Sequence, residues 1–435
     1  MLVLHTADWH LGTRFHDQRR GDDEDHALDQ LLAICARRRV DAVLVAGDVF
    51  DHANPGAEEQ KRYYRFLSRL GNEAGVATVV VTAGNHDSAL RLEGPRELLT
   101  DLGIHIVGRW RRDAPADDIL VPLKDRSGEI RALCAAVPYL RDGDLRLAEV
   151  GETAIQVHAR YARALGARYG EARGAARREA PELPLVIMGH CFVQGADLGG
   201  GERPIQVGNL ALLDAAEVAG DAAYLALGHL HRPQDVGARH WRYCGSLLPT
   251  GFDETETRRE AVLVDLPDAA GVPAQIERFV LKPFRRYLRL RGTVDDVAER
   301  IDQLPKATDD EPTPWCEAVV TLEGPSPGLA QELADRAQER GWGLVSVRRD
   351  VHRRSPTPPG GDAGPALEEL EPEDVFERRH QEEYGTLPDD ELRTEFRALL
   401  ETVTRGGDGS ELPPGSADAG QGEDFGASGN AAGDP

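Results

Sequence analysis

The stretch Ala42-Val43-Leu44-Val45-Ala46-Gly47-Asp48 carries the pattern that decides the fold, an apolar run followed by a glycine and a carboxylate. Short apolar, β-branched runs predict buried strands, and a glycine just beyond lets the backbone turn sharply and approach a ligand. Similar endings occur at four other places: Leu2-Val3-Leu4 before Asp8 and His10, Thr78-Val79-Val80-Val81 before Asn85, Leu185-Val186-Ile187-Met188 before His190, and Tyr224-Leu225-Ala226-Leu227 before His229 and His231. We therefore predict buried strands whose carboxyl ends present polar side chains.

These strand ends are expected to meet at one place, because ligands of open α/β sheets bind outside the carboxyl ends of the strands. A lone histidine after a strand is commonly a polar turn residue, but five coincident endings argue against that interpretation. The mixture of carboxylate, amide and imidazole suits manganese, iron or zinc better than calcium. These ligands are too many for one tetrahedral metal ion. Their number suits two metal ions that share a carboxylate. The predicted ligands are Asp8, His10, Asp48, Asn85, His190, His229 and His231.

His86 follows a predicted ligand and is the candidate catalytic residue. We hypothesise that its ring faces a scissile phosphate and either stabilises developing charge or protonates the leaving oxygen. Asp87 is expected to hold the ring of His86 by a hydrogen bond and keep it protonated. Asp51 is expected to support a ligand or bond within its loop, not to bind metal directly.

Length and charge limit the possible classes of protein. A chain of 435 residues exceeds the size at which one core usually stops growing, so more than one domain is expected. The formal net charge of −24 does not favour nucleic acid as a partner, because phosphate attraction needs positive surface. Basic islands could still bind DNA locally, although solvated surface arginine is the simpler explanation of each: Arg109-Trp110-Arg111-Arg112, Arg285 to Arg291, and Arg348 to Arg354.

The chain also lacks the signals of a membrane or secreted protein. No apolar run approaches the roughly 18 residues that a membrane helix needs. The sequence opens on a predicted strand, with no basic region followed by a long apolar segment, so a secretory signal is not expected. The five cysteines are odd in number and widely spread, which favours neither a disulfide framework nor a zinc ribbon. We expect a protein of the reducing cytoplasm with no membrane segment.

The order of the elements predicts a layered α/β domain over residues 1–282. Strand-like runs alternate there with helix-like segments at 25–38, 58–72, 91–102 and 145–178. A smaller α+β domain is predicted at 283–352, from strands at 287–290, 316–322 and 343–347 and helices at 294–304 and 328–340.

The remaining residues divide into three parts by composition. A Pro/Gly-rich linker is predicted at 353–365, C-terminal helices at 366–404 and a disordered acidic tail at 405–435. Within the helices, an apolar stripe at helical spacing either docks on a partner or packs back onto its own chain. The stripe consists of Leu392, Phe396, Leu399, Leu400 and Val403.

Taken together, the motifs Asp8-x-His10, Gly47-Asp48-x-x-Asp51, Gly84-Asn85-His86-Asp87, Gly189-His190 and Gly228-His229-x-His231 resemble those of the calcineurin-like metallophosphoesterase superfamily. The surrounding residues are similar to the SbcD family of bacterial nuclease subunits over roughly residues 1–404. Further similarity lies in Arg242-Tyr243-Cys244-Gly245-Ser246, Phe252-Asp253-Glu254 and Val375-Phe376-Glu377-Arg378-Arg379. The resemblance implies an α/β fold, a layered metallophosphoesterase β-sandwich flanked by helices, with a small α+β capping domain and C-terminal helices.

The same resemblance implies a function. It suggests a manganese-dependent DNA nuclease of repair, recombination and replication, with two divalent metal ions that are expected to be Mn²⁺. Such an enzyme degrades duplexes from 3′ ends in an ATP-dependent way and cuts single strands and hairpins. The chain has no Gly-x-x-x-x-Gly-Lys-[Ser/Thr] loop, so ATP hydrolysis is expected from an SbcC-like coiled-coil ATPase bound to residues 366–404. The family also implies a homodimer within a heterotetramer, for which helices 58–72 and 91–102 are candidates.

Two alternatives stay open at this level. The same ligand set would serve a phosphoesterase acting on a nucleotide or a phosphoprotein, although the Arg-bearing second domain and the C-terminal helices argue against it. An inactive scaffold that presents the ATPase to DNA is the other, and the presence of all seven ligands and His86 argues against that.

Overall fold

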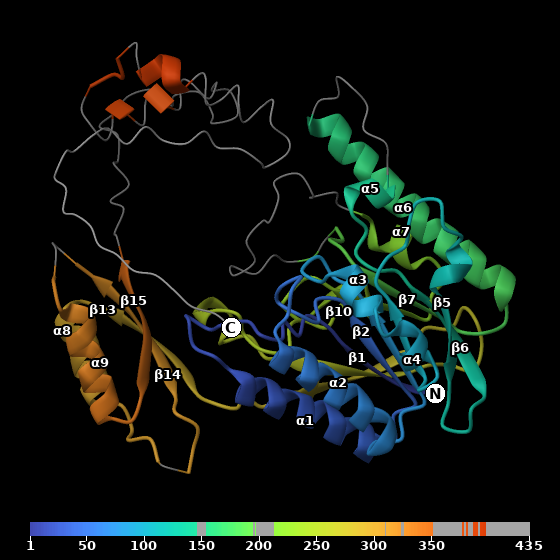
Figure 1. Cartoon of the computed structure of the whole chain (residues 1–435), viewed down its shortest axis with the longest axis horizontal. Coiled ribbons are helices and arrows are strands. Elements are labelled where there is room, and N and C mark those ends of the chain that lie inside the picture. The colour runs from blue at the N-terminus through green and yellow to red at the C-terminus, as the bar shows by residue number, and fades with distance from the viewer. Residues whose placement is uncertain are drawn as a thin grey trace, which may run out of the picture. The chain divides into compact units, whose positions relative to one another are not determined.

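The computed structural model describes residues 1–145, 154–194, 196, 213–308, 310–322 and 326–350, and after these only 376–377, 380–381, 386–389 and 392–396. The chain forms two compact units, Met1–His352 and Arg353–Pro435. The first contains every strand of the described residues (Figure 1).

The first sheet of this unit has six strands in the order β12-β11-β1-β2-β3-β4. Strands β1 to β4 are parallel, and β11 and β12 add an antiparallel edge beside β1. Their bounds are β1 (Leu2–Thr6), β2 (Ala42–Ala46), β3 (Thr78–Thr82), β4 (Ile104–Val107), β11 (Glu260–Asp265) and β12 (Gln275–Val280). The parallel strands therefore end at one edge of the sheet.

The second sheet also has six strands, in the order β5-β6-β7-β8-β10-β9. Strands β6, β7, β8 and β10 are parallel, whereas β5 and β9 are antiparallel to their neighbours. Their bounds are β5 (Leu120–Lys124), β6 (Ile130–Ala136), β7 (Leu185–His190), β8 (Tyr224–Gly228), β9 (Gln234–Val236) and β10 (Ala238–Tyr243).

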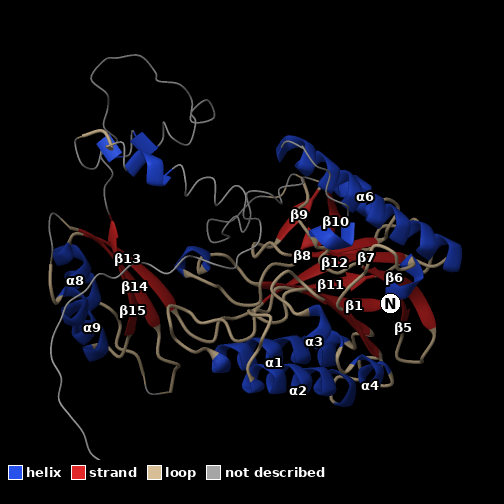
Figure 2. Cartoon of the chain, turned by 45° about the horizontal axis from the view of Figure 1, so that its top comes forward, coloured by secondary structure: helices blue, strands red, loops and turns tan. Residues whose placement is uncertain are grey.

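The two sheets pack face to face, and helices cover their outer faces (Figure 2). Alternation along β2 shows the reason: Ala42 and Leu44 lie in the core between the sheets, while Val43 and Val45 lie in the core under the helices. The helices are α1 (Gly21–Arg38), α2 (Ala57–Asn72), α3 (Ala89–Glu93), α4 (Arg96–Thr100), α5 (Asp142–Leu145), α6 (Ala154–Glu179) and α7 (Ala215–Ala219). This is the layered β-sandwich flanked by helices that the resemblance implied.

Helix α2 illustrates how the sequence produces this layer. Tyr63, Phe66, Leu67 and Leu70 are its buried residues, and their spacing places them on one face of the helix. The prediction of a single helix over residues 91–102 was wrong, because the chain forms α3 and α4 instead. Pro95 explains the break, since it has no backbone N–H to continue the hydrogen-bond ladder of a helix.

A third sheet forms what we call the small layer, residues Tyr287–Asp350. Its strands are all parallel, in the order β13-β14-β15, and its helices connect them. The bounds are β13 (Tyr287–Gly292), α8 (Val294–Asp302), β14 (Trp315–Thr321), α9 (Leu329–Glu339) and β15 (Gly343–Asp350). The predicted strands and helices of this region are confirmed, and they enclose a core of their own around Leu290, Ala318 and Leu333.

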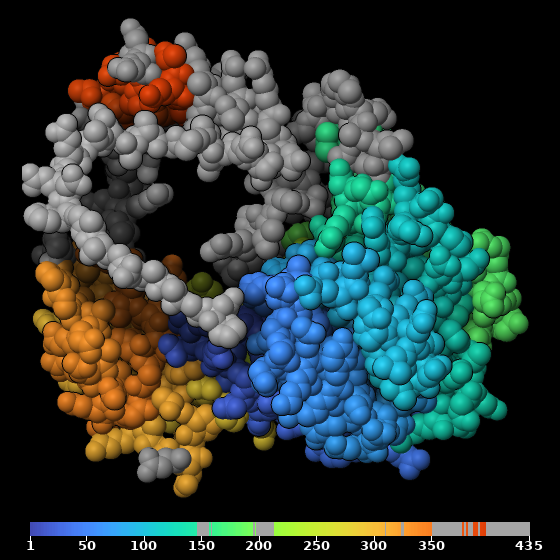
Figure 3. Space-filling model, viewed as in Figure 1, coloured from blue at the N-terminus to red at the C-terminus, as the bar shows by residue number. Residues whose placement is uncertain are grey.

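Buried contacts join the small layer to the first helix and loop of the chain. Phe15 stacks on Trp315 with ring centroids 5.6 Å apart, and Tyr287 packs against Phe15 at 5.1 Å. The Arg285 guanidinium donates to the buried Asp23 carboxylate at 2.6 and 2.8 Å. Figure 3 shows the orange surface of the small layer adjoining the blue surface of the N-terminal residues.

The second unit is described only in part. Phe376 stacks on Phe396 at 4.2 Å between ring centroids, and Arg393 pairs with Glu377 at 3.1 Å. Phe396, one member of the predicted apolar stripe, thus contacts another residue of its own segment. The predicted linker at 353–365, the tail at 405–435 and most of the helices at 366–404 lie outside the described residues. Throughout the described part of the chain, no helix combines the length and apolarity needed to cross a bilayer.

Candidate metal centre

The strand ends that carry the predicted ligands meet in space. The backbone N–H of Asp8, beyond β1, donates to the carbonyl of Gly47, beyond β2, at 3.0 Å, and His10 N–H donates to the carbonyl of Asp48 at 3.0 Å. From β8, the N–H of His229 donates to the Asp8 carboxylate at 2.9 Å. The predicted convergence of the strand ends is therefore confirmed.

Two glycines make this close approach possible. Gly47 has φ +85°, and a side-chain carbon there would lie 2.2 Å from Nδ1 of His190. A side-chain carbon at Gly84 would lie 2.0 Å from Oδ1 of Asp48. Neither position can accept a side chain without displacing a residue of the centre, so the glycines after these strands are steric requirements.

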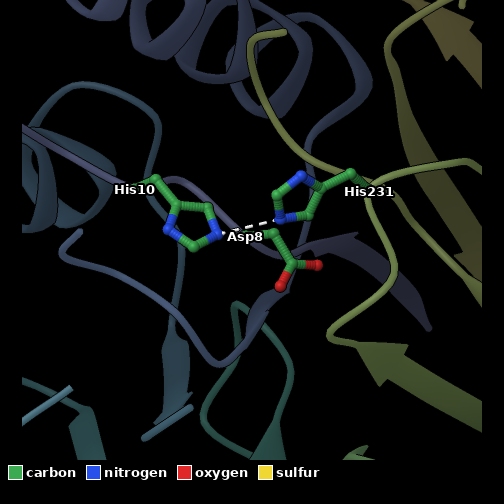
Figure 4. A group of neighbouring side chains, drawn as sticks. All are labelled: Asp8, His10 and His231. Atoms are coloured by element: carbon green, nitrogen blue, oxygen red, sulfur yellow. Dashed lines mark hydrogen bonds between the residues drawn. The ribbon is translucent and has the colours of Figure 1, made fainter. Parts of the chain in front are cut away.

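One group of ligand-type atoms contains Asp8, His10 and His231. Atoms of these three residues lie within 4.8 Å of one another, and Nε2 of His10 lies 3.1 Å from Nε2 of His231. Figure 4 shows the facing nitrogens of the two rings, with the Asp8 side chain beside them. Asp8 and His10 are buried, and His231 is partly exposed.

A second group contains Asp48, His190 and His229, again with ligand-type atoms within 4.8 Å of one another. Asn85 joins it: its Oδ1 lies 3.0 Å from Nε2 of His190 and 3.0 Å from Nδ1 of His229. The aromatic ring of Phe192 packs against His229 at 4.2 Å between centroids and forms an apolar wall beside this group.

Asp48 stands between the two groups. Its Oδ2 lies 3.3 Å from Nε2 of His190 in one group and 3.7 Å from Nε2 of His10 in the other. Its Oδ1 accepts the backbone N–H of His86 at 2.9 Å, which fixes the plane of the carboxylate. This is the position expected of a carboxylate shared by two cations.

The hydrogen bonds on the outer side of the rings fit a divalent cation. Nδ1 of His190 donates to the Ala46 carbonyl at 2.9 Å, and Nδ1 of His231 donates to Oε1 of Glu254 at 3.0 Å. Each neutral ring then carries a lone pair on Nε2, directed at other acceptor atoms of the centre. Acceptors that face acceptors require a cation or a proton between them, and imidazole and carboxylate are suitable ligands for a transition metal.

The pKa values of the buried groups reflect their burial and the close approach of carboxylates and imidazole rings. Burial raises the pKa of the Asp8 carboxyl to about 7. Burial also acts against ionisation of Asp48, but the His190 ring outweighs it and the pKa of Asp48 lies well below its usual range. Burial favours neutral His190 as well, yet the charge of Asp48 prevails and raises the pKa of His190 to about 9. Burial lowers the pKa of His229 to about 3. Without a cation, a proton on His190 thus balances Asp48.

His86 is partly exposed, and its ring joins His10 and Asp48 in a third group of ligand-type atoms within 4.8 Å of one another. Its ring packs edge-on against His10 at 4.8 Å between centroids, and its Nδ1 donates to the backbone carbonyl of Asp51 at 2.8 Å. The expectation that Asp87 holds this ring was wrong. The Asp87 carboxylate is buried and accepts three backbone N–H groups, from Val49, Phe50 and Gly84, at 2.9 to 3.1 Å.

Two family models match the chain. Calcineurin-like phosphoesterase matches residues 1–233, and the type 5 capsule protein repressor C-terminal domain matches residues 283–384. The SbcD protein of the SbcCD nuclease from Rhodobacter capsulatus is 34% identical over 372 residues, which cover 82% of this chain and 90% of the relative. The chain belongs to the SbcD family of calcineurin-like phosphoesterases. The Escherichia coli K12 member of the SbcD family is 29% identical over 407 residues, 93% of this chain and 98% of the relative.

Two solved structures match the chain at low identity. TT1561 of Thermus thermophilus is 15% identical with a TM-score of 0.34, and the match covers 65% of this chain and 99% of that one. A dimetal phosphatase from Danio rerio is 13% identical with a TM-score of 0.33, with the same coverage of 65% and 99%.

In this SbcD-family chain, all eight predicted site residues lie together, while their roles as ligands and catalyst stay predictions. Sequence reasoning missed the groups behind them: the Ala46 carbonyl, Glu254 and Arg259. Glu254 lies in the quoted stretch Phe252-Asp253-Glu254, but its sequence position gave no sign of contact with His231. The arginine island at 285–291 is also only partly available, because Arg285 and Arg289 are held in ion pairs with Asp23 and Glu317.

Proposed function

We propose that this chain is a metal-dependent DNA nuclease subunit of an SbcCD-like complex. The observation that carries the proposal is the pair of adjacent ligand groups joined by Asp48 at the carboxyl ends of the strands. The relatives are named as the D component of the SbcCD nuclease, which supports the choice of DNA over a small phosphoester.

In this proposal each ligand group holds one divalent cation, and Mn²⁺ is the ion we expect. Asp8, His10 and His231 would hold one cation, and Asn85, His190 and His229 the other, with Asp48 shared. When bound, such a pair supplies Lewis-acid activation of the attacking water and neutralises charge on the phosphate.

The chain's own contribution to the chemistry would come from His86. Because Nδ1 of His86 donates to the carbonyl of Asp51, Nε2 is the nitrogen that can meet a phosphate. A protonated ring can donate from Nε2 to the leaving oxygen or stabilise developing negative charge. Its partial exposure, in contrast to the buried Asp8, His10 and Asp48, allows contact with a substrate.

The substrate we propose is DNA: duplex ends degraded in the 3′ to 5′ direction with ATP hydrolysed by the partner, and single strands or hairpins cut internally. Residues 283–352 would form the capping and DNA-binding domain. Exposed Arg291 and Arg349 of the small layer are the first candidates for phosphate contacts, since Arg285 and Arg289 are paired within the protein. Arg348 is exposed as well, although its guanidinium lies 4.0 Å from Glu317.

The partner we propose is an SbcC-like coiled-coil ATPase that docks on residues 366–404, in a cytoplasmic heterotetramer containing a homodimer of this chain. Support for a self-association surface comes from α3, α4 and the residues after them, where Leu90, Leu98 and Leu102 are 78%, 70% and 65% exposed. All five cysteines are buried free thiols, as expected of a protein from a reducing compartment.

Replacement of His86 by alanine tests the assignment. We expect cleavage of a labelled hairpin and of a duplex end, with Mn²⁺, ATP and the partner present, to fall by about 10² to 10⁴. Metal content should stay at the wild-type level, because His86 is placed outside the ligand set. Loss of bound metal together with activity would show that His86 is a ligand instead. A wild-type protein that hydrolyses small phosphoesters but no DNA would favour the alternative phosphoesterase.

A further inference from the structure

We propose that Glu254, held in place by Arg259, is the positioning residue that fixes the His231 ring for cation binding. The inference rests on the proposed function, since it assigns His231 to a metal. It adds a buried carboxylate and a buried arginine behind the proposed ligands, and neither belongs to the ligand set.

The Glu254 carboxylate is saturated with donors. Oε1 accepts Nδ1–H of His231 at 3.0 Å and the Thr250 hydroxyl at 2.8 Å. Oε2 accepts the backbone N–H of Thr250 at 3.0 Å and the Arg259 guanidinium at 3.0 Å. A carboxylate held by four donors cannot rotate without breaking several bonds, so it fixes the direction of the His231 ring.

Arg259 donates hydrogen bonds to both residues of the His231–Glu254 contact. Its guanidinium donates to the carboxylate of Glu254 and also to the backbone carbonyls of His231 and Glu254, at 2.9 and 2.7 Å. A further donation goes to Oγ of Ser246 at 2.7 Å. Arg259 and Glu254 are both buried, so solvent does not weaken the pair. The ring of His231 and the carboxylate behind it are therefore clamped by one planar group.

This arrangement determines which nitrogen of His231 faces the centre. Donation from Nδ1 to Glu254 leaves the lone pair on Nε2, the atom that lies 3.1 Å from Nε2 of His10. Carboxylates behind metal-ligating histidines fix the tautomer and raise the basicity of the ring, and their loss typically costs about 10- to 100-fold in metal affinity or activity.

The turn that supplies Glu254 also contacts the small layer. Phe252 packs against Tyr287 at 6.4 Å between ring centroids, and Asp253 pairs with Arg289 at 2.6 Å. The turn of Phe252, Asp253 and Glu254 thus links the small layer to the carboxylate that holds His231.

The test is a Mn²⁺ titration of the full-length chain, with free Mn²⁺ counted by its electron paramagnetic resonance signal and the fold checked by circular dichroism. We expect Glu254→Gln, which removes the charge and offers Arg259 an amide, to weaken one Mn²⁺ site by about 10- to 100-fold and leave the other unchanged. Glu256→Gln is the matched control, because Glu256 lies two residues away and is exposed, and it should bind as wild type. Arg259→Lys keeps the positive charge but loses the planar guanidinium that donates to several acceptors at once, so it should weaken the same Mn²⁺ site.

The possible outcomes distinguish the positioning role from the proposed function. A wild-type chain that binds no divalent cation would overturn the proposed function itself. Wild-type binding by a folded Glu254→Gln chain would overturn only the positioning role. Should that variant fail to fold, Glu254→Asp, which keeps the charge and withdraws the carboxylate by one methylene, decides the question: unchanged binding at both sites contradicts the proposal.

Discussion

Asp8, His10, Asp48 and His229 have φ values of 50°, 44°, 48° and 101°, which residues other than glycine rarely adopt. Backbone of this kind costs on the order of 1–3 kcal/mol per residue, and it persists only where the surroundings enforce it. Here the enforcing contacts are the backbone bonds between the loops after β1 and β2 and the donation from His229 to Asp8. The strained backbone therefore lies at residues that we assign as ligands of the cations.

Substitution of Gly84 tests whether the backbone around Asp48 tolerates an added side chain. We expect Gly84→Ala to abolish Mn²⁺ binding and to lower the free energy of unfolding by about 1–3 kcal/mol or more, because a methyl group there would overlap Asp48. Gly71→Ala is the control: Gly71 lies in helix α2 with no atom within 4 Å of the added carbon, so it should gain about 0.4–1 kcal/mol. Urea unfolding measures both. Equal, small effects of the two substitutions would contradict the steric role of Gly84.

His5 gives the fold a dependence on pH that is separate from catalysis. Its ring is buried in β1 and bonds to the Tyr224 hydroxyl at 2.9 Å, and burial lowers its pKa to about 3. The unfolded chain binds a proton near pH 6.5, so the stabilising contribution is full above that pH and is lost as the pH falls toward 3.

We therefore expect the free energy of unfolding, measured in chelator, to fall more steeply between pH 6.5 and pH 4 in the wild type than in His5→Gln. The difference in slope should approach about 1.4 kcal/mol per pH unit. Glutamine keeps a polar group opposite Tyr224 but does not titrate. Parallel curves for the two proteins would show that His5 does not supply this dependence.

At the level of elements, helix α1 is the support for the small layer. Asp23 in its first turn is buried and accepts Arg285 Nε and a terminal nitrogen, and also the Tyr287 hydroxyl at 3.1 Å. Arg285 in turn lies over the Trp315 ring at 3.9 Å. Removal of one partner of such a buried pair leaves an uncompensated charge in a dry environment.

Asp23→Asn is expected to lower the free energy of unfolding by about 3–5 kcal/mol, because Arg285 loses its counter-ion in a buried position. Asp22→Asn removes the same charge from the same helical turn at an exposed position, and should cost less than about 1 kcal/mol. Thermal and urea unfolding of both variants provide the comparison. A loss no larger for Asp23 than for Asp22 would refute the buried pair as a support of the small layer.

Across the whole molecule, the sequence predicted best what depends on neighbouring residues. Each site residue lies at or just beyond the carboxyl end of a strand, so a local pattern was enough to find Asp8 or His190, and the parallel strands brought them together. Contacts between distant segments were not accessible: Glu254 lies 23 residues from His231, and nothing local links them. Asp87 was assigned to His86 because they are adjacent, whereas three backbone N–H groups compete for its carboxylate.

The charge of the chain shows the same limit. Arginines at 285 and 289 looked available to DNA in the sequence, but the fold uses both in internal ion pairs. Only the three-dimensional arrangement distinguishes them from Arg291 and Arg349, which stay exposed.

The proposed function depends on a pair of cations at the strand ends, and anomalous diffraction from crystals grown with Mn²⁺ tests that directly. We predict two anomalous peaks on either side of the Asp48 carboxylate, one next to His10 and His231 and the other next to His190 and His229. Peaks elsewhere on the protein, or none within ligand distance of these side chains at saturating Mn²⁺, would contradict it.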